Sequence, residues 1–192
     1  HEYALPKHKR PLSHPLCFSQ PVILGSGKFM KTVKCETPEG ACVVKIYAEQ
    51  GAGGRSFREY RDLLSRVSRR LHGQPNVLPY ARAVECGGTT ACLVRQYFRY
   101  TLRSRLSSRP FLAPLEKRWA AFLLLNALRQ LHENHAVHGD IKAENVICTS
   151  WGWYLLTDFA CFKPPHLPGN DPAAFHFFFE SRGRRRCYLA PE

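Results

Sequence analysis

The sequence lacks the cysteine and histidine spacings that hold a structural metal ion or a disulfide framework. Eight cysteines are scattered along its 192 residues, and no two of them form a Cys-x-x-Cys pair. The nine histidines show no ligand spacing either. Several cysteines, such as Cys42 and Cys92, lie within apolar runs. We therefore expect reduced, buried thiols in a cytoplasmic protein.

No segment approaches the roughly 20 consecutive apolar residues that a membrane-spanning helix needs. The longest candidate, residues 119–128, is interrupted by Asn126 and suits a buried helix. A secretory signal is also missing. The chain begins at His1 and stops after Ala190-Pro191-Glu192. We expect a fragment of a longer protein, whose missing start could carry a targeting or lipidation signal.

Acidic residues are scarce: the chain has 15 Asp and Glu but 28 Lys and Arg, which gives a formal charge of +13. This balance favours nucleotides, phosphorylated lipids, nucleic acid or acidic proteins as partners, although a solubilising surface has the same composition. Aromatic residues do not alternate with arginines on a stacking surface, so we expect no nucleic-acid partner. Residues 175–179, an aromatic segment before the basic run 182–186, are interpreted as a docking surface.

Short β-type segments fill the first half of the chain after an irregular lead-in at residues 1–20. Turn residues separate these segments, which are rich in valine and isoleucine. One amphipathic helix, residues 56–71, interrupts them, with apolar positions spaced by three and four. The predicted strands are residues 22–24, 29–35, 41–47, 81–85 and 91–97.

A mainly helical part follows. Pro114 can open a helix, because proline is tolerated at the first helical position. Two short strands, residues 145–148 and 153–156, come after it. The order predicts an α+β fold with a β-rich lobe (residues 21–96) joined near residues 96–99 to a partial α-helical lobe (residues 97–192). We expect the helix to be largely buried through an apolar face that is widened by its neighbours: Ala121, Leu124, Leu125, Leu128 and Leu131, with Trp119, Phe122 and Leu123.

Three positions in the β-rich part could bind an anion. Gly25-Ser26-Gly27 lies between two strands, where glycines let the backbone approach phosphate, although such a pair is also an ordinary turn. Lys45 lies in an apolar strand, and a buried amine is costly without an anionic partner. Glu59 on the following helix is the natural partner. The alternative is an exposed lysine at a strand edge and a solvated glutamate.

A polar segment after the helix carries the clearest chemistry. Residues 138–145 place Asp140, Lys142 and Asn145 at relative positions 0, +2 and +5. An aspartate can accept a hydroxyl proton, a lysine can neutralise a transferring phosphoryl group, and an asparagine oxygen can hold magnesium. Asp158 follows eighteen residues after Asp140, at a predicted strand end that suits a second metal contact.

These residues resemble the protein-kinase signature set. More closely, the chain is similar over about residues 22–192 to the vacuolar protein sorting fifteen family, the kinase-like regulatory subunit of the class III phosphatidylinositol 3-kinase complex. The segments that carry this resemblance are residues 108–112, 116–119, 138–142, 149–153, 158–160 and 184–188, followed by Ala190-Pro191-Glu192.

The resemblance implies a two-lobed kinase-like fold whose α-helical lobe is truncated at the activation segment. It implies ATP, with GTP as an alternative, and Mg²⁺. Asp140 would accept the proton, with Lys142 beside it, and Asn145 and Asp158 would hold metal. The nucleotide phosphates would lie against residues of the first lobe, with a carboxylate partner for its lysine: Gly25, Gly27, Lys45 and Glu59.

The resemblance also implies a function for the whole protein. It would be a non-specific serine/threonine protein kinase acting in autophagy and endosomal or vacuolar sorting. Its partners would be the class III lipid-kinase catalytic subunit and its adaptor subunits. It would be cytoplasmic and peripheral on endosomal and autophagic membranes through that complex. The alternative is a catalytically weak or inactive pseudokinase scaffold that binds nucleotide and regulates the lipid kinase by contact.

Four departures from the kinase pattern bear on activity. Gly139 replaces the arginine that usually pairs with an activation-loop phosphate, so loop phosphorylation is not expected as the switch. Ala160 replaces a glycine and restricts the metal-binding triplet. Arg185 stands where a threonine usually lines the substrate groove. Met30 stands near the third glycine of the phosphate loop, which predicts a bulkier lid.

Overall fold

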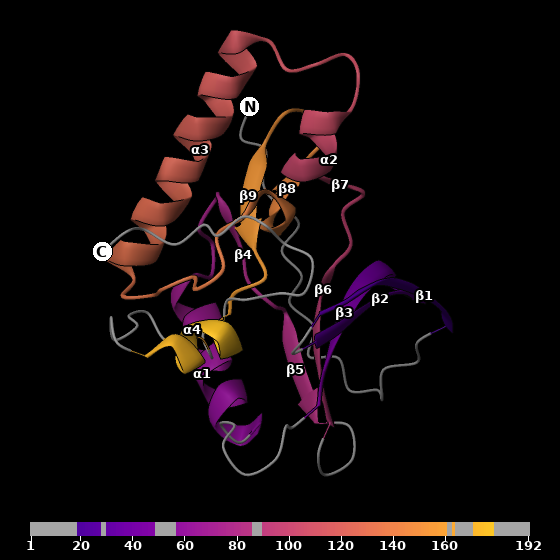
Figure 1. Ribbon diagram of the computed structural model, residues 1–192. Helices are drawn as coiled ribbons and strands as arrows, with labels where there is room; N and C mark the ends of the chain where they lie inside the picture. The colour runs from indigo at the N-terminus through magenta and orange to yellow at the C-terminus, as the bar shows by residue number, and fades with distance from the viewer. Residues whose placement is uncertain are drawn as a thin grey trace.

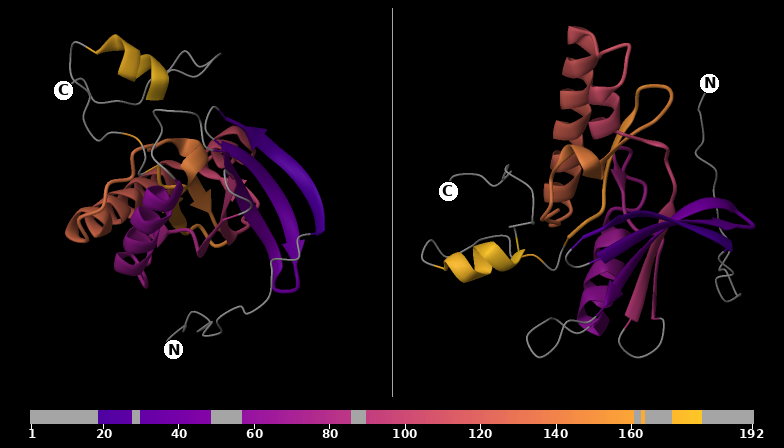
Figure 2. Two further views of the ribbon diagram at one scale, coloured as in Figure 1. Left: turned by 90° about the horizontal axis from the view of Figure 1, so that it is seen from below. Right: turned by 45° about the vertical axis from the view of Figure 1, so that its right-hand side comes forward.

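A computed structural model describes residues 19–27, 30–48, 57–85, 90–160, 163 and 171–178. In these residues, the first half of the chain forms a curved antiparallel sheet (Figures 1 and 2). Its strand order is β1-β2-β3-β6-β5. The strands span β1 (Ser19–Ser26), β2 (Met30–Thr37), β3 (Gly40–Ala48), β5 (Arg82–Glu85) and β6 (Thr90–Gln96).

Successive side chains along each strand point to opposite faces of the sheet. One face carries a small core of valines and cysteines. Lys45 and Arg95 lie on the other face, because each follows a residue of this core, and they are diagonal neighbours: Lys45 pairs with Leu93, and Arg95 pairs with Val43. The valine and cysteine core consists of Val33, Cys35, Cys42, Val44, Cys92 and Val94.

The helix α1 (Phe57–Arg70) packs its apolar face into the main hydrophobic core. Its buried residues Tyr60, Leu64 and Val67, with Leu71 directly after its last residue, are spaced by four, three and four, as one face of a helix requires. This confirms the predicted amphipathic helix, and all five predicted strands are likewise present. Glu59 precedes Tyr60 and is exposed.

A second sheet combines β4, which precedes β5 in the chain, with three strands that follow β6. In the part of the chain that the structure describes, its strand order is β4-β9-β8-β7; β4 and β9 pair in parallel, and the other two pairs are antiparallel. The predicted strands at residues 145–148 and 153–156 are confirmed within one residue as β8 and β9, whereas β4, β7 and the helix α2 (Leu102–Ser107) were not predicted. The strands span β4 (Val77–Leu78), β7 (Tyr100–Thr101), β8 (Val146–Cys148) and β9 (Tyr154–Thr157).

The long helix α3 (Pro114–Glu133) lies beside the second sheet, as Figures 1 and 2 show. Pro114 is its first residue, as predicted. A buried polar contact fixes the helix: the Gln130 side chain accepts a hydrogen bond from the Asn76 amide (3.1 Å) and donates one to the Asn76 side chain (3.1 Å). Asn76 precedes β4, so this contact joins α3 to the start of the second sheet.

The predicted buried face of α3 is wrong in part. Leu125 and Phe122 are 66% and 52% exposed, and Ala121 is exposed too. Leu123 and Leu131 of the predicted face are buried, and the other buried residues are Ala120, Ala127 and Gln130, which were not predicted. Apolar residues surround this helix almost completely, so periodicity alone could not select the face; the small alanines lie where the helix meets the sheet.

The short helix α4 (Pro172–Phe178) stands apart from both sheets in the two views of Figure 2. Phe175, from the predicted docking surface, is exposed there. Within the described residues, no helix is both long and apolar enough to cross a membrane. Cys35, Cys42, Cys92 and Cys148 are buried thiols, as expected.

Candidate functional site

Asp158 lies directly after β9, where the two sheets approach each other. Its backbone has φ = +66°, a left-handed conformation that is uncommon for any residue other than glycine. The carboxylate is almost fully buried and forms an ion pair with Lys45, at 2.9 Å between Nζ and Oδ2. The buried lysine therefore has the anionic partner that the sequence required, but the partner is Asp158.

Arg95 on β6 also binds Asp158. Its Nε donates to Oδ1 at 2.8 Å, and its Nη2 donates to Oδ2 at 3.2 Å. Burial alone would raise the pKa of the Asp158 carboxyl, but the charges of Lys45 and Arg95 outweigh burial and hold this pKa far below its usual range. Asp158 is therefore ionised and carries two positive partners.

Glu59 does not have the position that was predicted for it. It lies exposed in the first turn of α1, and the ion pair at Lys45 is made with Asp158. Tyr60 faces the core instead, fully buried, with its hydroxyl donating to the Phe159 carbonyl at 3.3 Å. Adjacent residues on a helix point about 100° apart, so burying Tyr60 turns Glu59 away from the core.

Asp140 lies in the loop between α3 and β8. Lys142 from the same loop and Lys163 form ion pairs with it, and Lys163 Nζ lies 2.8 Å from Oδ1. Asn145 donates to the Asp140 carbonyl at 2.7 Å and to Oδ2 at 2.9 Å. Burial raises the pKa of the Asp140 carboxyl, but the two lysines outweigh it and lower the pKa to about 2.

His138 connects the two carboxylates. Its Nδ1 accepts a hydrogen bond from the Asp140 amide at 3.2 Å, so Nε2 carries the proton and donates to the Thr157 carbonyl at 2.7 Å. Thr157 immediately precedes Asp158. Burial lowers the pKa of His138 and keeps the ring neutral. Through His138, the structure thus joins the segment of Asp140 and Asn145 to the Lys45–Asp158 pair at the end of β9.

Gly139 has a structural explanation. Its φ is +77°, and a Cβ atom there would lie 2.6 Å from the Ala160 carbonyl oxygen. The Ala160 amide donates to the His138 carbonyl at 2.8 Å, so the two segments are in direct backbone contact. An arginine does not fit at this position, which accounts for the departure from the kinase pattern.

The glycine turn is the most open part of the site. A Cβ at Gly25 would meet no atom within 4 Å, and the Gly27 amide donates to the Met30 carbonyl at 2.9 Å. Met30 itself packs against Tyr47 and Ala91, so the structure places this side chain in the core and does not support the predicted bulkier lid.

A carboxylate and an amide oxygen are donor types that magnesium takes beside nucleotide phosphates, but Lys45 and Arg95 already hold both oxygens of Asp158. Magnesium is usually bound by one or two carboxylates plus phosphate oxygens, rather than by an all-protein cage. The described residues contain no cluster of three or more His, Cys, Asp or Glu, in agreement with this pattern. Asp158 supplies a carboxylate. The amide nitrogen of Asn145 is used in its bonds to Asp140, so its side-chain oxygen is the atom that remains for a metal.

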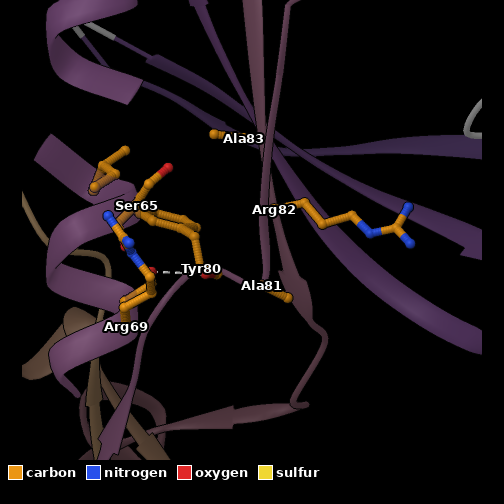
Figure 3. A pocket seen from close by; sticks show the side chains of 8 residues that line it. Ser65, Arg69, Tyr80, Ala81, Arg82 and Ala83 are labelled. Carbon is orange, nitrogen blue, oxygen red and sulfur yellow. Dashed lines mark hydrogen bonds between the residues drawn. The ribbon is translucent and has the colours of Figure 1, made fainter. Parts of the chain in front are cut away.

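A separate cavity of about 240 Å³ lies between α1 and β5, away from these residues. In Figure 3, Arg69 and Arg82 point away from each other on either side of it. The Ser68 hydroxyl donates to the Tyr80 carbonyl across its floor at 3.0 Å. None of the predicted site residues lines it, so it is not the nucleotide site.

Sequence reasoning missed Arg95, Lys163 and Tyr60. Arg95 carried the same signal as Lys45, because it is a cation in the apolar segment 91–97, and burial there demands an anion. Lys163 gave no signal, since it follows Asp158-Phe159-Ala160 in a proline-rich part of the sequence without periodicity. Tyr60 was assigned to the correct helix face, but its bond to Phe159 depends on the tertiary fold.

Comparison with known proteins agrees with this geometry. A family model described as the protein kinase domain matches residues 18–192. The chain therefore belongs to the protein kinase family, and its two sheets and helices are a truncated form of the two-lobed kinase fold. Ala190-Pro191-Glu192 and Arg185 fall inside the match but outside the residues that the structure describes.

Within this family the chain is similar to kinases named VPS15, which confirms the predicted relationship. It is 46% identical to "Serine/threonine-protein kinase VPS15" of Arabidopsis thaliana over the whole chain, and 42% identical to the protein of that name in Saccharomyces cerevisiae over 88% of the chain. A "Probable serine/threonine-protein kinase vps15" of Dictyostelium discoideum is 44% identical over 88% of the chain. The chain spans only 9 to 12% of the length of these relatives.

Proposed function

We propose that this region binds a nucleoside triphosphate with magnesium and transfers its terminal phosphoryl group to a serine or threonine hydroxyl of a protein. The Lys45–Asp158 ion pair of 2.9 Å carries the proposal. It joins the strand lysine to the carboxylate at the end of β9, the two groups that kinase chemistry places at the phosphates and at the metal. ATP is the proposed nucleotide, with GTP as the alternative.

Each polar group has a defined task in this proposal. Asp140 is ionised at neutral pH and accepts the proton of the attacking hydroxyl. Lys142 offsets charge on the transferring group, and Lys45 positions the phosphates. Asn145 and Asp158 would hold Mg²⁺, which supplies charge neutralisation at the phosphate oxygens when bound. Gly25 and Gly27 leave the approach to the phosphates open.

A second candidate function is supported by the lysines at Asp140. Lys163 occupies Oδ1 of Asp140, while Lys142 and Asn145 occupy Oδ2. The hydroxyl of a substrate would have to displace one of these groups. The second candidate is accordingly a pseudokinase that binds nucleotide and regulates a partner by contact, with little phosphoryl transfer.

For the whole protein we propose the role that its resemblance implies. It would be the kinase-like regulatory subunit of the class III phosphatidylinositol 3-kinase complex, acting in autophagy and endosomal or vacuolar sorting. Its partners would be the lipid-kinase catalytic subunit and the adaptor subunits, and it would reach endosomal membranes through them. Co-purification of the full-length protein with a phosphatidylinositol 3-kinase tests this; isolation without any lipid kinase contradicts it.

The two candidate functions are separated by one pair of variants of the full-length protein. In Asp140→Asn, loss of the proton acceptor should lower autophosphorylation by about 10² to 10⁴-fold, while the dissociation constant for ATP stays within about threefold, a free-energy change below 1 kcal/mol. Asp62→Asn, at an exposed position of α1, removes the same charge outside the site and is the matched surface control. Equal activity of Asp140→Asn and wild type rules out phosphoryl transfer at this site and supports the scaffold.

A further inference from the structure

Arg95 is a buried arginine at the proposed nucleotide site. It lies near the end of β6, and its side chain is only 8% exposed. The backbone partner of Arg95 across the sheet is Val43 on β3, which fixes its position against the strand that carries Lys45. Its Nη1 donates to the Gln96 carbonyl at 3.1 Å. Strand pairing and this bond hold the guanidinium in one orientation.

The guanidinium takes both oxygens of Asp158. A bidentate pair of this kind is shorter, stronger and more directional than a single charged hydrogen bond. Lys45 adds a third donor, at Oδ2. Burial and the negative charge of Asp158 raise the pKa of the Tyr80 hydroxyl well above its ordinary value, so Tyr80 stays neutral beside this carboxylate. Few acceptor directions of the carboxylate remain.

The charge balance around this carboxylate is unusual for a group that would bind metal. Lys45 and Arg95 together exceed the single negative charge of Asp158, before any divalent ion is present. At Asp140, likewise, Lys142 and Lys163 exceed one negative charge. These pairs leave a net positive charge around the two carboxylates, which attracts a triphosphate without help from a metal.

A divalent ion also gains less from Asp158 than from a solvated carboxylate. Magnesium demands near-octahedral geometry and releases its waters reluctantly. To coordinate Asp158 it must approach an anion whose charge two buried cations already offset, and must avoid the guanidinium that spans both oxygens. Electrostatic repulsion and the occupied lone pairs both disfavour that approach.

We infer that Arg95 is a built-in counter-ion for Asp158, which makes nucleotide binding by this protein only weakly dependent on divalent metal. The inference rests on the proposed nucleotide site and specifies how that site neutralises its own carboxylate. Arg95 is a positioning and specificity-determining residue: it acts through Asp158, and it sets which cation accompanies the nucleotide.

The test measures binding rather than catalysis. The full-length protein is titrated with a fluorescent ATP analogue by anisotropy, in Mg²⁺ and in EDTA. For the wild type, the dissociation constant should rise less than about tenfold when EDTA replaces Mg²⁺, which is about 1.4 kcal/mol. We define the metal ratio as the dissociation constant in EDTA divided by that in Mg²⁺. In Arg95→Met, whose side chain has similar length and no charge, this ratio should exceed about 100-fold. The reason is that Asp158 then repels the phosphates unless a metal is bound.

Two further variants make the result specific. Arg95→Lys keeps the charge but loses the bidentate contact with Asp158. Its ratio of dissociation constants in EDTA and in Mg²⁺ should lie between those of wild type and Arg95→Met. Arg66→Met removes the same charge from the exposed side of α1, and should match wild type. If Arg95→Met fails to fold, Arg95→Lys and the wild-type ratio decide the question.

The outcomes separate this inference from the proposed function. A wild-type ratio above about 100-fold, or equal ratios in wild type and the Arg95 variants, overturns the counter-ion role while leaving nucleotide binding intact. Absence of ATP-analogue and GTP-analogue binding under every condition contradicts the nucleotide site itself.

Discussion

Asp158 and Asp140 are each held by two cations, but in different surroundings. The Asp158 side chain is 7% exposed and its partners, Lys45 and Arg95, project from neighbouring strands of the first sheet. The Asp140 side chain is 24% exposed, and its partners are Lys142 from its own loop and Lys163. The partners of Asp158 are fixed by the hydrogen-bonded strands of a sheet, whereas the partners of Asp140 lie outside the strands. Asp158 should therefore contribute to stability and binding, and Asp140 to chemistry.

The largest effect is expected for Asp158→Ala. Removing it leaves two buried cations without their anion, and breaking such a buried pair costs about 3 to 5 kcal/mol. Asp140→Ala should cost about 1 kcal/mol, because the Asp140 side chain is 24% exposed against 7% for Asp158, and solvent weakens its ion pairs. Hydrogen exchange at the β3 and β6 amides of the full-length protein measures both changes. Equal losses in the two variants would remove the proposed difference between the carboxylates.

Gly139→Ala tests the loop around Asp140. At φ = +77°, a side chain costs about 1 to 2 kcal/mol, and the contact of 2.6 Å with the Ala160 carbonyl should add about 1 to 3 kcal/mol of overpacking. Gly152→Ala is the matched control, because Gly152 has φ = +76° and open space around its Cβ position. The difference in thermal midpoint between the two variants isolates the close contact. Identical shifts of the thermal midpoint in the two variants would mean that the Ala160 backbone moves away from the new side chain without a loss of stability.

A smaller effect is expected from His138, the residue that links the two carboxylates. Its pKa in the folded protein is lowered by burial, so protonation favours the unfolded chain. The contribution of neutral His138 to the free energy of unfolding should be fully present above about pH 6.5, the ordinary histidine pKa, and should be lost as the pH drops below it. The slope cannot exceed about 1.4 kcal/mol per pH unit for one group.

The pH slope is measured as the thermal midpoint between neutral and mildly acid pH, above the range in which Asp140 and Asp158 take up protons. These two carboxyls have lowered pKa values, so their contribution is present above the ordinary aspartate pKa and is lost only at lower pH. His138→Gln should flatten the slope, and His132→Gln, at an exposed position of α3, should not. An unchanged slope in His138→Gln would show that another group titrates.

The smallest effect is expected for Lys163→Ala. Freeing Oδ1 of Asp140 should raise autophosphorylation by a few-fold, worth less than about 1 kcal/mol, without changing ATP affinity. Lys163→Arg keeps the ion pair and serves as the control. A loss of activity in Lys163→Ala would instead assign Lys163 a positive role in catalysis.

Much of the fold followed from local patterns. The five strands of the first sheet, α1 and the start of α3 were predicted, because alternation, helical spacing and Pro114 are local signals. The two-residue strands β4 and β7 were not, since they exist only through pairing with β9 and β8. The face of α3 was misassigned because apolar residues lie almost all around it.

The site was predicted as a set of residues but not as a set of pairs. Lys45 was correctly expected to meet an anion, yet Asp158 was 113 positions away along the chain, and Glu59 was chosen because it was nearer. Which carboxylate meets the lysine depends on the rotation of α1, and burial of Tyr60 decides that rotation. Arg95 was overlooked although its position in an apolar strand required an anion.

The central claim is that Lys45 and Asp158 on one side, and Asp140 and Asn145 on the other, form one nucleotide site. The most direct measurement is the thermal midpoint of the full-length protein with and without ATP, in wild type and in Lys45→Met. The account predicts that ATP raises the midpoint of the wild type and has little effect on Lys45→Met. An equal rise in both proteins, or none in the wild type, would contradict it.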